Sequence, residues 1–269
     1  AATDNGGGIL NTGSSATLDV LNGSTIGGTQ GSTGNTADNG AGLYNDASGS
    51  VTVDASTVSG NAAATFGGGF RNVGSGSQVT LDGSTISDNS SGQSGGGFAN
   101  SGEATVIVQN DSHISGNTAT ILGGGFYNFN PNSSVTVTDS HISANSTPLA
   151  GTAGLESGGG FYNVDGIITI TRSTIGGLTP ADANVAELGG GFWMQRGTLT
   201  IEQSAIIGNS AGGGNGVGGG FVSDAASSTL TNVTISNNTA DVSAAAFSES
   251  GSAGGLTLNY VTVVANSSA

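Results

Sequence analysis

The sequence has no cysteine and almost no basic residues. Without cysteine, neither a disulfide framework nor a thiolate metal site can form. Lysine and arginine together number 3 against 18 aspartate and glutamate residues, which gives a formal net charge of −15. Because nucleic acid is bound by neutralising its phosphates with basic groups, these counts exclude nucleic acid and anionic membranes as partners.

Long hydrophobic runs are missing too. No stretch approaches the roughly 18 apolar residues of a membrane helix, and the chain does not open with a charged and then apolar signal segment. We therefore expect no membrane insertion. The sequence is typical of a secreted chain whose signal peptide has been removed, located outside the cell or at its surface.

Glycine, in contrast, is abundant, with 51 residues against 3 prolines. The absence of a triplet period excludes a collagen triple helix, so this composition indicates a chain with many tight turns. Internal repetition is the strongest pattern. Nine units, 26 to 35 residues apart, each open with a small-residue triplet followed by a large apolar residue. They begin at Gly6, Gly40, Gly67, Gly95, Gly123, Gly158, Gly189, Gly218 and Ala244.

Each unit carries three short runs in which apolar and polar residues alternate, separated by Gly, Asn, Asp and Ser. This pattern predicts strands and turns. Stacked repeats of three strands predict an all-β fold, a right-handed single-stranded parallel β-helix of about nine coils that forms one domain over residues 1–269. The large apolar residues after the triplets should point inward. They include Phe70, Phe98, Phe126, Phe161, Phe192, Phe221 and Phe247.

Two series of asparagines recur at fixed places in the units, where stacked amides can hydrogen-bond from coil to coil. The first lies two residues after the large apolar residue and comprises Asn11, Asn45, Asn72, Asn100, Asn128 and Asn163. The second closes the third strand and comprises Asn61, Asn89, Asn117, Asn145, Asn209, Asn238 and Asn266.

The repeat resembles that of the polymorphic outer-membrane protein family, whose units alternate FxxN with GGA and an aliphatic residue. Here ISGN at 114–117 precedes GGGF at 123–126, and ISDN at 86–89 precedes GGGF at 95–98. The resemblance covers nearly the whole chain and implies a right-handed β-helix exposed on a microbial surface, which in that family is an autotransported adhesin. Phenylalanine replaces the family's aliphatic residue.

An enzyme of the carbohydrate-active β-helix type would need converging carboxylates and a basic residue. The three arginines, Arg71, Arg172 and Arg196, fall at unrelated positions of their units. The recurrent aspartates before the third strand, such as Asp111 and Asp139, are explained by turn formation. We therefore expect no catalytic residues, no cofactor and no enzymatic activity, with a carbohydrate-active enzyme kept as an alternative.

Two further patterns carry possible ligands. His113 and His141 occupy the same outward position in adjacent coils, near enough to share a metal ion, but an exposed polar ladder with no metal is the favoured interpretation because threonine takes that position elsewhere. Threonines such as Thr52, Thr136 and Thr200 form a regular line on the second strand, as on ice-binding solenoids. One line per face and the strand preference of threonine make ice binding an alternative only.

Aromatic residues mark a possible ligand face. Tyr127, Tyr162 and Trp193 follow the Phe in three consecutive units and should point outward in a line, where they could hold a sugar. The extra segments 146–157, 178–188 and 210–217 precede the triplets in the same region, and these loops could instead cover the aromatics. Both interpretations stay open.

The two ends of the chain suggest self-assembly. Asn266 is followed by Ser267, Ser268 and Ala269, and joining these to Ala1–Asn5 restores the same spacing that separates Asn209 from Gly218. Uncapped coils expose strand edges. We therefore predict a non-enzymatic structural protein that stacks head to tail into an extracellular filament. The predicted contact places Gly6, Gly7, Gly8 and Ile9 of one copy against Val261, Val263 and Asn266 of another. The alternative is an adhesin-like binding module that contacts glycans or a neighbouring cell surface.

Overall fold

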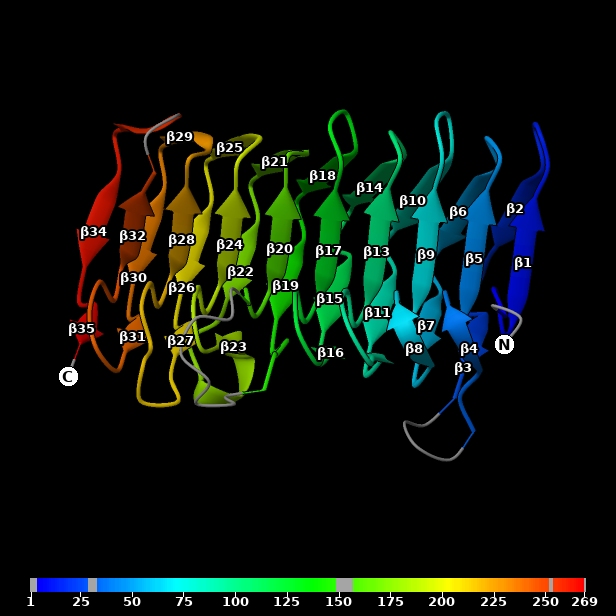
Figure 1. The fold of residues 1–269 in the computed structure, drawn as a ribbon, viewed down its shortest axis with the longest axis horizontal. Helices are drawn as coiled ribbons and strands as arrows, with labels where there is room; N and C mark the ends of the chain where they lie inside the picture. The colour runs from blue at the N-terminus through cyan, green and yellow to red at the C-terminus, as the bar shows by residue number, and fades with distance from the viewer. Residues whose placement is uncertain (1–3, 29–32, 149–156, 252–253, 269) are drawn as a thin grey trace.

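The computed structural model describes residues 4–28, 33–148, 157–251 and 254–268, and it shows a parallel β-helix (Figure 1). Three nine-stranded sheets run along the axis, and every strand pair between coils is parallel. The predicted all-β, right-handed parallel β-helix is therefore confirmed. Helical structure in the described residues is limited to one 3₁₀ turn, η1 (Pro180–Asp182). None of the described helices has the length and apolar character needed to cross a lipid bilayer.

The first sheet begins directly after the glycine triplets. Its strands are β1 (Ile9–Thr12), β5 (Leu43–Asp46), β9 (Phe70–Val73), β13 (Phe98–Ser101), β17 (Phe126–Phe129), β20 (Phe161–Val164), β24 (Phe192–Gln195), β28 (Phe221–Asp224) and β32 (Phe247–Ser250). Residues at the first and third positions point into the coil, and the other two point outward, because side chains alternate along a strand.

The second and third sheets close the coil. The second contains β2 (Thr17–Val20), β6 (Ser50–Asp54), β10 (Gln78–Asp82), β14 (Thr105–Gln109), β18 (Ser134–Thr138), β21 (Ile167–Thr171), β25 (Thr198–Glu202), β29 (Ser227–Thr231) and β33 (Gly255–Asn259). The third contains β3 (Thr25–Gly27), β7 (Thr57–Ser59), β11 (Thr85–Ser87), β15 (His113–Ser115), β19 (His141–Ser143), β22 (Thr174–Gly176), β26 (Ala205–Ile207), β30 (Thr234–Ser236) and β34 (Thr262–Val264).

A fourth line of strands was not predicted. It consists of two four-stranded sheets, one with β4 (Thr36–Asn39), β8 (Ala62–Phe66), β12 (Ser90–Ser91) and β16 (Thr118–Ala119), the other with β23 (Val185–Ala186), β27 (Ser210–Ala211), β31 (Thr239–Ala240) and β35 (Ser267–Ser268). Isolated bridges from Ser146 to Thr118 and Val185 connect the two. Most of these strands have two residues, which is too short for an alternating pattern to appear in the sequence.

The Phe series forms the centre of the core, as predicted. Consecutive rings from Phe70 to Phe247 stack in parallel, with ring centroids 4.5 to 5.1 Å apart. The rings of Phe98, Phe126 and Phe161 are fully buried. This spacing follows from the distance between hydrogen-bonded strands, about 4.7–4.9 Å. The stack therefore ties each coil to both of its neighbours.

Both predicted asparagine ladders are present. In the first, each side-chain amide from Asn11 to Asn128 donates to Oδ1 of the next asparagine at 2.8 to 3.0 Å. The second ladder is longer than predicted. It also contains Asn35 and Asn184, and Asn184 accepts from Asn145 and donates to Asn209.

A third ladder consists of serines and had not been recognised in the sequence. The backbone N–H of Ser56 donates to Oγ of Ser84, that of Ser84 to Oγ of Ser112, and the pattern repeats through Ser140. These serines are buried at the turn before the third sheet. Because buried polar groups are costly without partners, the three ladders explain how a thin coil contains so many polar side chains.

The glycine triplet lies where a side chain has no room. Gly123 has φ +62°, which a side chain would strain, and a Cβ on Gly124 would meet the backbone of Gly159 and Ser146. The triplet thus marks the place where the first sheet and the fourth line of strands are in contact.

Candidate functional site

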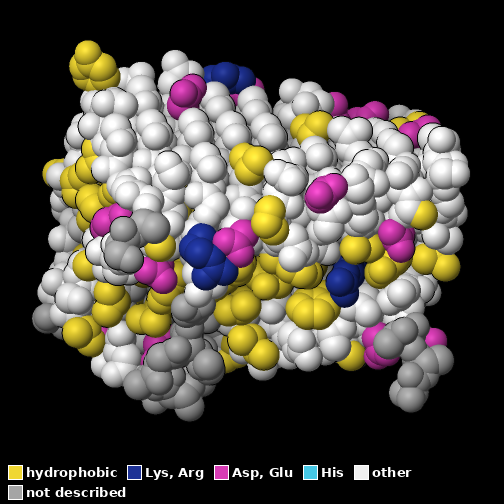
Figure 2. All heavy atoms as spheres, turned by 45° about the horizontal axis from the view of Figure 1, so that its top comes forward, with side chains coloured by type: hydrophobic (Ala, Val, Ile, Leu, Met, Phe, Trp, Pro, Cys, Tyr) yellow, Lys and Arg dark blue, Asp and Glu magenta, His cyan; other side chains and the backbone are white. Residues whose placement is uncertain are grey.

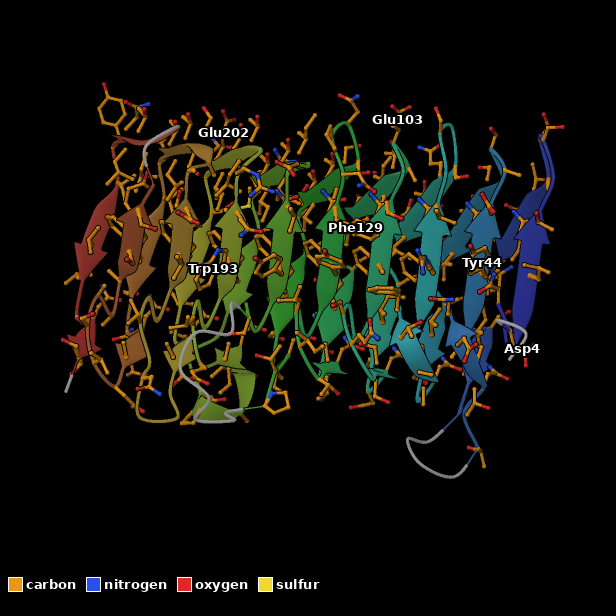
Figure 3. All side chains as sticks on the ribbon, viewed as in Figure 1. Asp4, Tyr44, Glu103, Phe129, Trp193 and Glu202 are labelled. Carbon is orange, nitrogen blue, oxygen red and sulfur yellow. The ribbon has the colours of Figure 1, made fainter. Side chains whose placement is uncertain are left out.

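The outward face of the first sheet contains the predicted aromatic line. Tyr127, Tyr162 and Trp193 are register partners on β17, β20 and β24, as expected. Their exposure is not as expected, because Tyr162 is 1% exposed and Trp193 is 8% exposed. Both belong to an apolar cluster with Val222. Of the two interpretations, an open ligand face is therefore wrong for Tyr162 and Trp193. Figure 3 labels Trp193 on β24 of the first sheet.

One inserted segment contributes to this burial. Leu188, the last residue of segment 178–188, packs against the buried pair, and so does Leu122. Residues 149–156 of the segment 146–157 lie outside the described residues. Within the third segment, 210–217, residues 210 and 211 form β27. The interpretation that the inserted segments cover the aromatics is thus supported for segment 178–188.

A different set of aromatic side chains stays half-buried on this face. Phe66 lies at the end of β8, and Tyr127 and Phe129 project from β17. The ring centroid of Tyr127 is 4.7 Å from that of Phe129, and Phe66 is 6.3 and 6.2 Å from the two. Ala99, the register partner of Tyr127 in the preceding coil, has only a methyl group and so leaves room for the Phe66 ring.

Arg71 completes this cluster. Its guanidinium carbon lies 4.8 Å from the ring centroid of Phe66, a cation–π contact, and one guanidinium nitrogen donates a 2.6 Å hydrogen bond to Oδ1 of Asn39. Burial lowers the pKa of Arg71 from its ordinary value, although its charge is kept at physiological pH. Beside it, burial raises the pKa of Tyr44.

We call Phe66, Arg71, Tyr127 and Phe129 the aromatic patch. Figure 2 shows hydrophobic side chains gathered along the face that contains the first sheet, with a basic side chain among them. Phe66 and Phe129 were missed in the sequence because they occupy different positions of different units. Only the folded coil brings them together.

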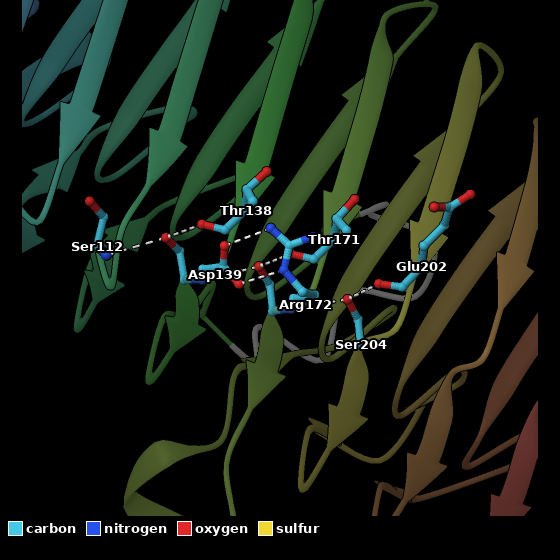
Figure 4. Close-up of polar contacts among 9 residues, drawn as sticks. Ser112, Thr138, Asp139, Thr171, Arg172, Glu202 and Ser204 are labelled. Carbon is cyan, nitrogen blue, oxygen red and sulfur yellow. Dashed lines mark hydrogen bonds and ion pairs between the residues drawn. The ribbon is translucent and has the colours of Figure 1, made fainter.

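The other two arginines bind aspartates of the preceding coil. Arg172 makes two hydrogen bonds of 2.7 Å to the carboxylate of Asp139 (Figure 4). Arg196 bonds both oxygens of Asp165. Hydrogen bonding to the guanidinium groups lowers the pKa of both carboxyls. These bidentate pairs link neighbouring turns. They do not place a carboxylate pair where a glycosidic bond could be held between two acids.

The outward face of the second sheet has more threonine than predicted. Each five-residue strand of this sheet has three outward-pointing positions, so the face contains three parallel lines of side chains and not one. Thr136 and Thr138 occupy two of these lines on β18, and Thr169 and Thr171 continue them on β21. Ile107 interrupts the central line between Thr80 and Thr136. This face is regular and mostly uncharged over β18 to β29. Ice binding, kept above as an alternative, stays a prediction.

The predicted assembly ends need a correction in register. The first sheet begins at β1 and ends at β32, and the third sheet begins at β3 and ends at β34. Stacking in the same register would therefore place Ile9 against Phe247 and Ile26 against Val263. The predicted contact of Gly6–Asn11 with Val261–Asn266 would join strands of different sheets, so it does not fit stacking in this register. End-to-end association itself stays a prediction. Residues 1–3 and 269, which entered the spacing argument, lie outside the described residues.

No protein-family model matches the chain, and comparisons with curated proteins and with solved structures also give no match.

Proposed function

We propose that this protein is a non-enzymatic binding module of the adhesin kind, which holds a neutral glycan against its aromatic patch outside the cell. The proposal is carried by one observation. Phe66, Tyr127 and Phe129 remain half-buried beside Arg71, on a rod whose surface consists mostly of small polar side chains. Apolar side chains that cluster at the surface and stay partly open to solvent commonly mark an interaction site.

The chemistry of the patch suits a sugar. Aromatic rings offer large apolar surfaces against which the C–H groups of a sugar ring can pack. Beside the rings, the Arg71 guanidinium supplies polar groups that can orient sugar hydroxyls. Because β17 is hydrogen-bonded on both sides, binding would order little of the backbone, which favours affinity.

The charge of the chain narrows the class of glycan. A net charge of −15 repels acidic polysaccharides at low ionic strength. A neutral polymer is not repelled, and it can lie along the axis of the rod over several coils. The proposal thus names neutral glycans, and an acidic polysaccharide should bind less well as salt is lowered.

Binding to a panel of neutral and acidic polysaccharides tests the proposal. We expect retention on at least one neutral polymer and a loss of at least tenfold in affinity, about 1.4 kcal/mol, in the double variant Phe66→Ser/Phe129→Ser. Tyr260→Ser is a matched control, because this aromatic residue is 87% exposed and lies at the C-terminal coil. Equal binding by the wild type and the double variant would reject the aromatic patch as the site. Assays for new reducing ends on the bound polymer should stay negative.

End-to-end association is a second candidate function, favoured by the C-terminal coil. Each coil adds one residue to every line of inward-pointing side chains, and we call such a line a column. Leu258 and Val263 are the last residues of two columns and are 40% and 47% exposed, whereas their register partners Leu230 and Ile235 are buried. A second copy stacked on this end would bury them. Three residues oppose this contact in the register of the sheets. Ala245 and Ala246 replace the second and third glycines, and Glu249 places a charge in an inward column.

A further inference from the structure

Two histidines and an aspartate come together on the third sheet, away from the aromatic patch. His113 begins β15, His141 begins β19, and the two are register partners. Their rings are parallel, with an interplanar angle of 13° and centroids 4.9 Å apart. Both rings are partly exposed, so they are open to solvent.

Asp111 reaches both rings from the turn before β15. Its Oδ1 atom lies 3.6 Å from Nε2 of His113 and 3.4 Å from Nε2 of His141. The turn is formed by Asn110 and Asp111, whose φ angles of 57° and 62° place the aspartate side chain over the strand that follows. Asn and Asp are the residues that tolerate this conformation best.

The distances suit a shared ion. A tetrahedral zinc centre with bonds of about 2.0–2.1 Å has ligand atoms about 3.3–3.4 Å apart. One ligand atom from each of the three residues lies within 4.8 Å of the others, so modest rotations of the two rings would bring both nitrogens onto one ion. Around the histidines, an open hollow lined by Ser143, Thr174 and Asp182 leaves room for water as a further ligand.

We propose that Asp111, His113 and His141 form a binding site for a divalent transition metal of the zinc type. Two imidazole nitrogens and one carboxylate oxygen are a donor set for zinc, copper or nickel, whereas calcium and magnesium prefer oxygen alone. The ion would connect the fourth and fifth coils, because His113 and His141 lie on neighbouring strands. The acidic chain would also raise the local concentration of cations.

The side chains found at the same position in neighbouring coils suggest substitutions of the histidines that should not disturb the fold. Threonine occupies the position of the histidines in the flanking coils, at Thr85 and Thr174. His113→Thr and His141→Thr therefore give the site the side chain that its neighbours already have. Glu103→Gln is the control, because it removes an exposed carboxylate on the same coil outside the cluster.

Calorimetric titration of the tag-free chain with Zn²⁺, and its melting temperature with and without Zn²⁺, test the proposal. We expect one equivalent bound by the wild type and by Glu103→Gln, a raised melting temperature in both, and at least a tenfold loss of affinity in each histidine variant. Asp111→Asn should weaken binding less than loss of a histidine, because an amide oxygen can still bind the ion. Failure of the wild type to bind at millimolar Zn²⁺, or an unchanged affinity and melting shift in His113→Thr/His141→Thr, would overturn it.

Discussion

The side-chain amide of Asn100 donates a 2.8 Å hydrogen bond to Oδ1 of Asn128, one coil further along the axis. The same nitrogen also lies within hydrogen-bonding distance of the carbonyl oxygens of Ala104 and Ser134, and Asn100 is fully buried. One side chain thus connects three coils, because Asn72 in turn donates to Asn100.

Replacement of Asn100 by Ala should lower the free energy of unfolding by about 1–3 kcal/mol, because it leaves buried neighbouring groups without partners. Chemical denaturation followed by circular dichroism measures the change. Thr136→Ala, on the outward face of the second sheet, should change stability by much less. A neutral result for Asn100→Ala would mean that the ladder contributes register without stability.

Phe126→Asp should destabilise the chain by several kcal/mol. The Phe126 ring is fully buried between Phe98 and Phe161, at centroid distances of 4.8 and 4.7 Å, so the variant places an unpaired carboxylate within the stack. Thermal melting compares it with Ile121→Asp, which introduces the same charge at a residue that is 40% exposed. Equal melting temperatures of the two variants would contradict the role assigned to the Phe stack.

Regular spacing made most of the fold predictable. The Phe stack and the first asparagine ladder recur at a constant offset from the triplets, so the sequence shows them directly. Asn184 was missed because it follows Ile175 only after the inserted η1 turn, whereas Asn117 comes three residues after Ile114. Its place in the ladder depends on the coil geometry, which restores the register after the insertion.

The candidate site was less predictable for a different reason. Tyr127 was identified from its position in the repeat, but the Phe66 ring reaches across Ala99 from another line of strands. The burial of Trp193 involves Leu188, which lies directly before its triplet and whose residue type changes from coil to coil, as its bridge partner Val217 shows. Both contacts join side chains at different positions of the repeat. Such contacts depend on side-chain volume and rotamer, which cannot be read from the spacing of the repeats.

The ion pair of Arg172 with Asp139 predicts a change in titration. Hydrogen bonding to the guanidinium holds the pKa of Asp139 below its ordinary value of 3.8. The pair therefore stabilises the fold above that pH, and its contribution is lost as the pH falls through the lowered pKa. In Arg172→Gln the pKa of Asp139 should rise, which carbon-detected NMR of the carboxyl can measure. Asp165 is the control, because its own pair with Arg196 is kept and its pKa should stay lowered in this variant. An unchanged pKa of Asp139 would contradict the paired geometry.

The last prediction concerns end-to-end association. Alanines in the last triplet and Glu249 oppose a second copy stacked on the C-terminal coil, so replacing them should strengthen association. In the eighth coil, a Cβ on Gly219 would meet the carbonyl oxygen of Ala245, and a Cβ on Gly220 would meet that of Ala246. Ala245 and Ala246 should therefore both oppose a coil stacked on them. Glu249 would become a buried charge in the column that contains Ser223. The triple variant Ala245→Gly/Ala246→Gly/Glu249→Asn should therefore associate more strongly than the wild type.

Sedimentation velocity and electron microscopy at increasing protein concentration measure this association. Any fibre should repeat at about nine strand spacings, roughly 43 Å, and should persist in salt, because screening reduces repulsion between acidic copies. Adding Val263→Pro should block it. The N–H of Thr262 is bonded to Val233 in the preceding coil, so the alternation of a parallel ladder turns that of Val263 toward the open edge. Proline there removes an edge donor without breaking a bond within the chain. If the triple variant stays a monodisperse monomer at all ionic strengths, the terminal coils do not stack, and the exposure of Leu258 and Val263 has no part in self-assembly.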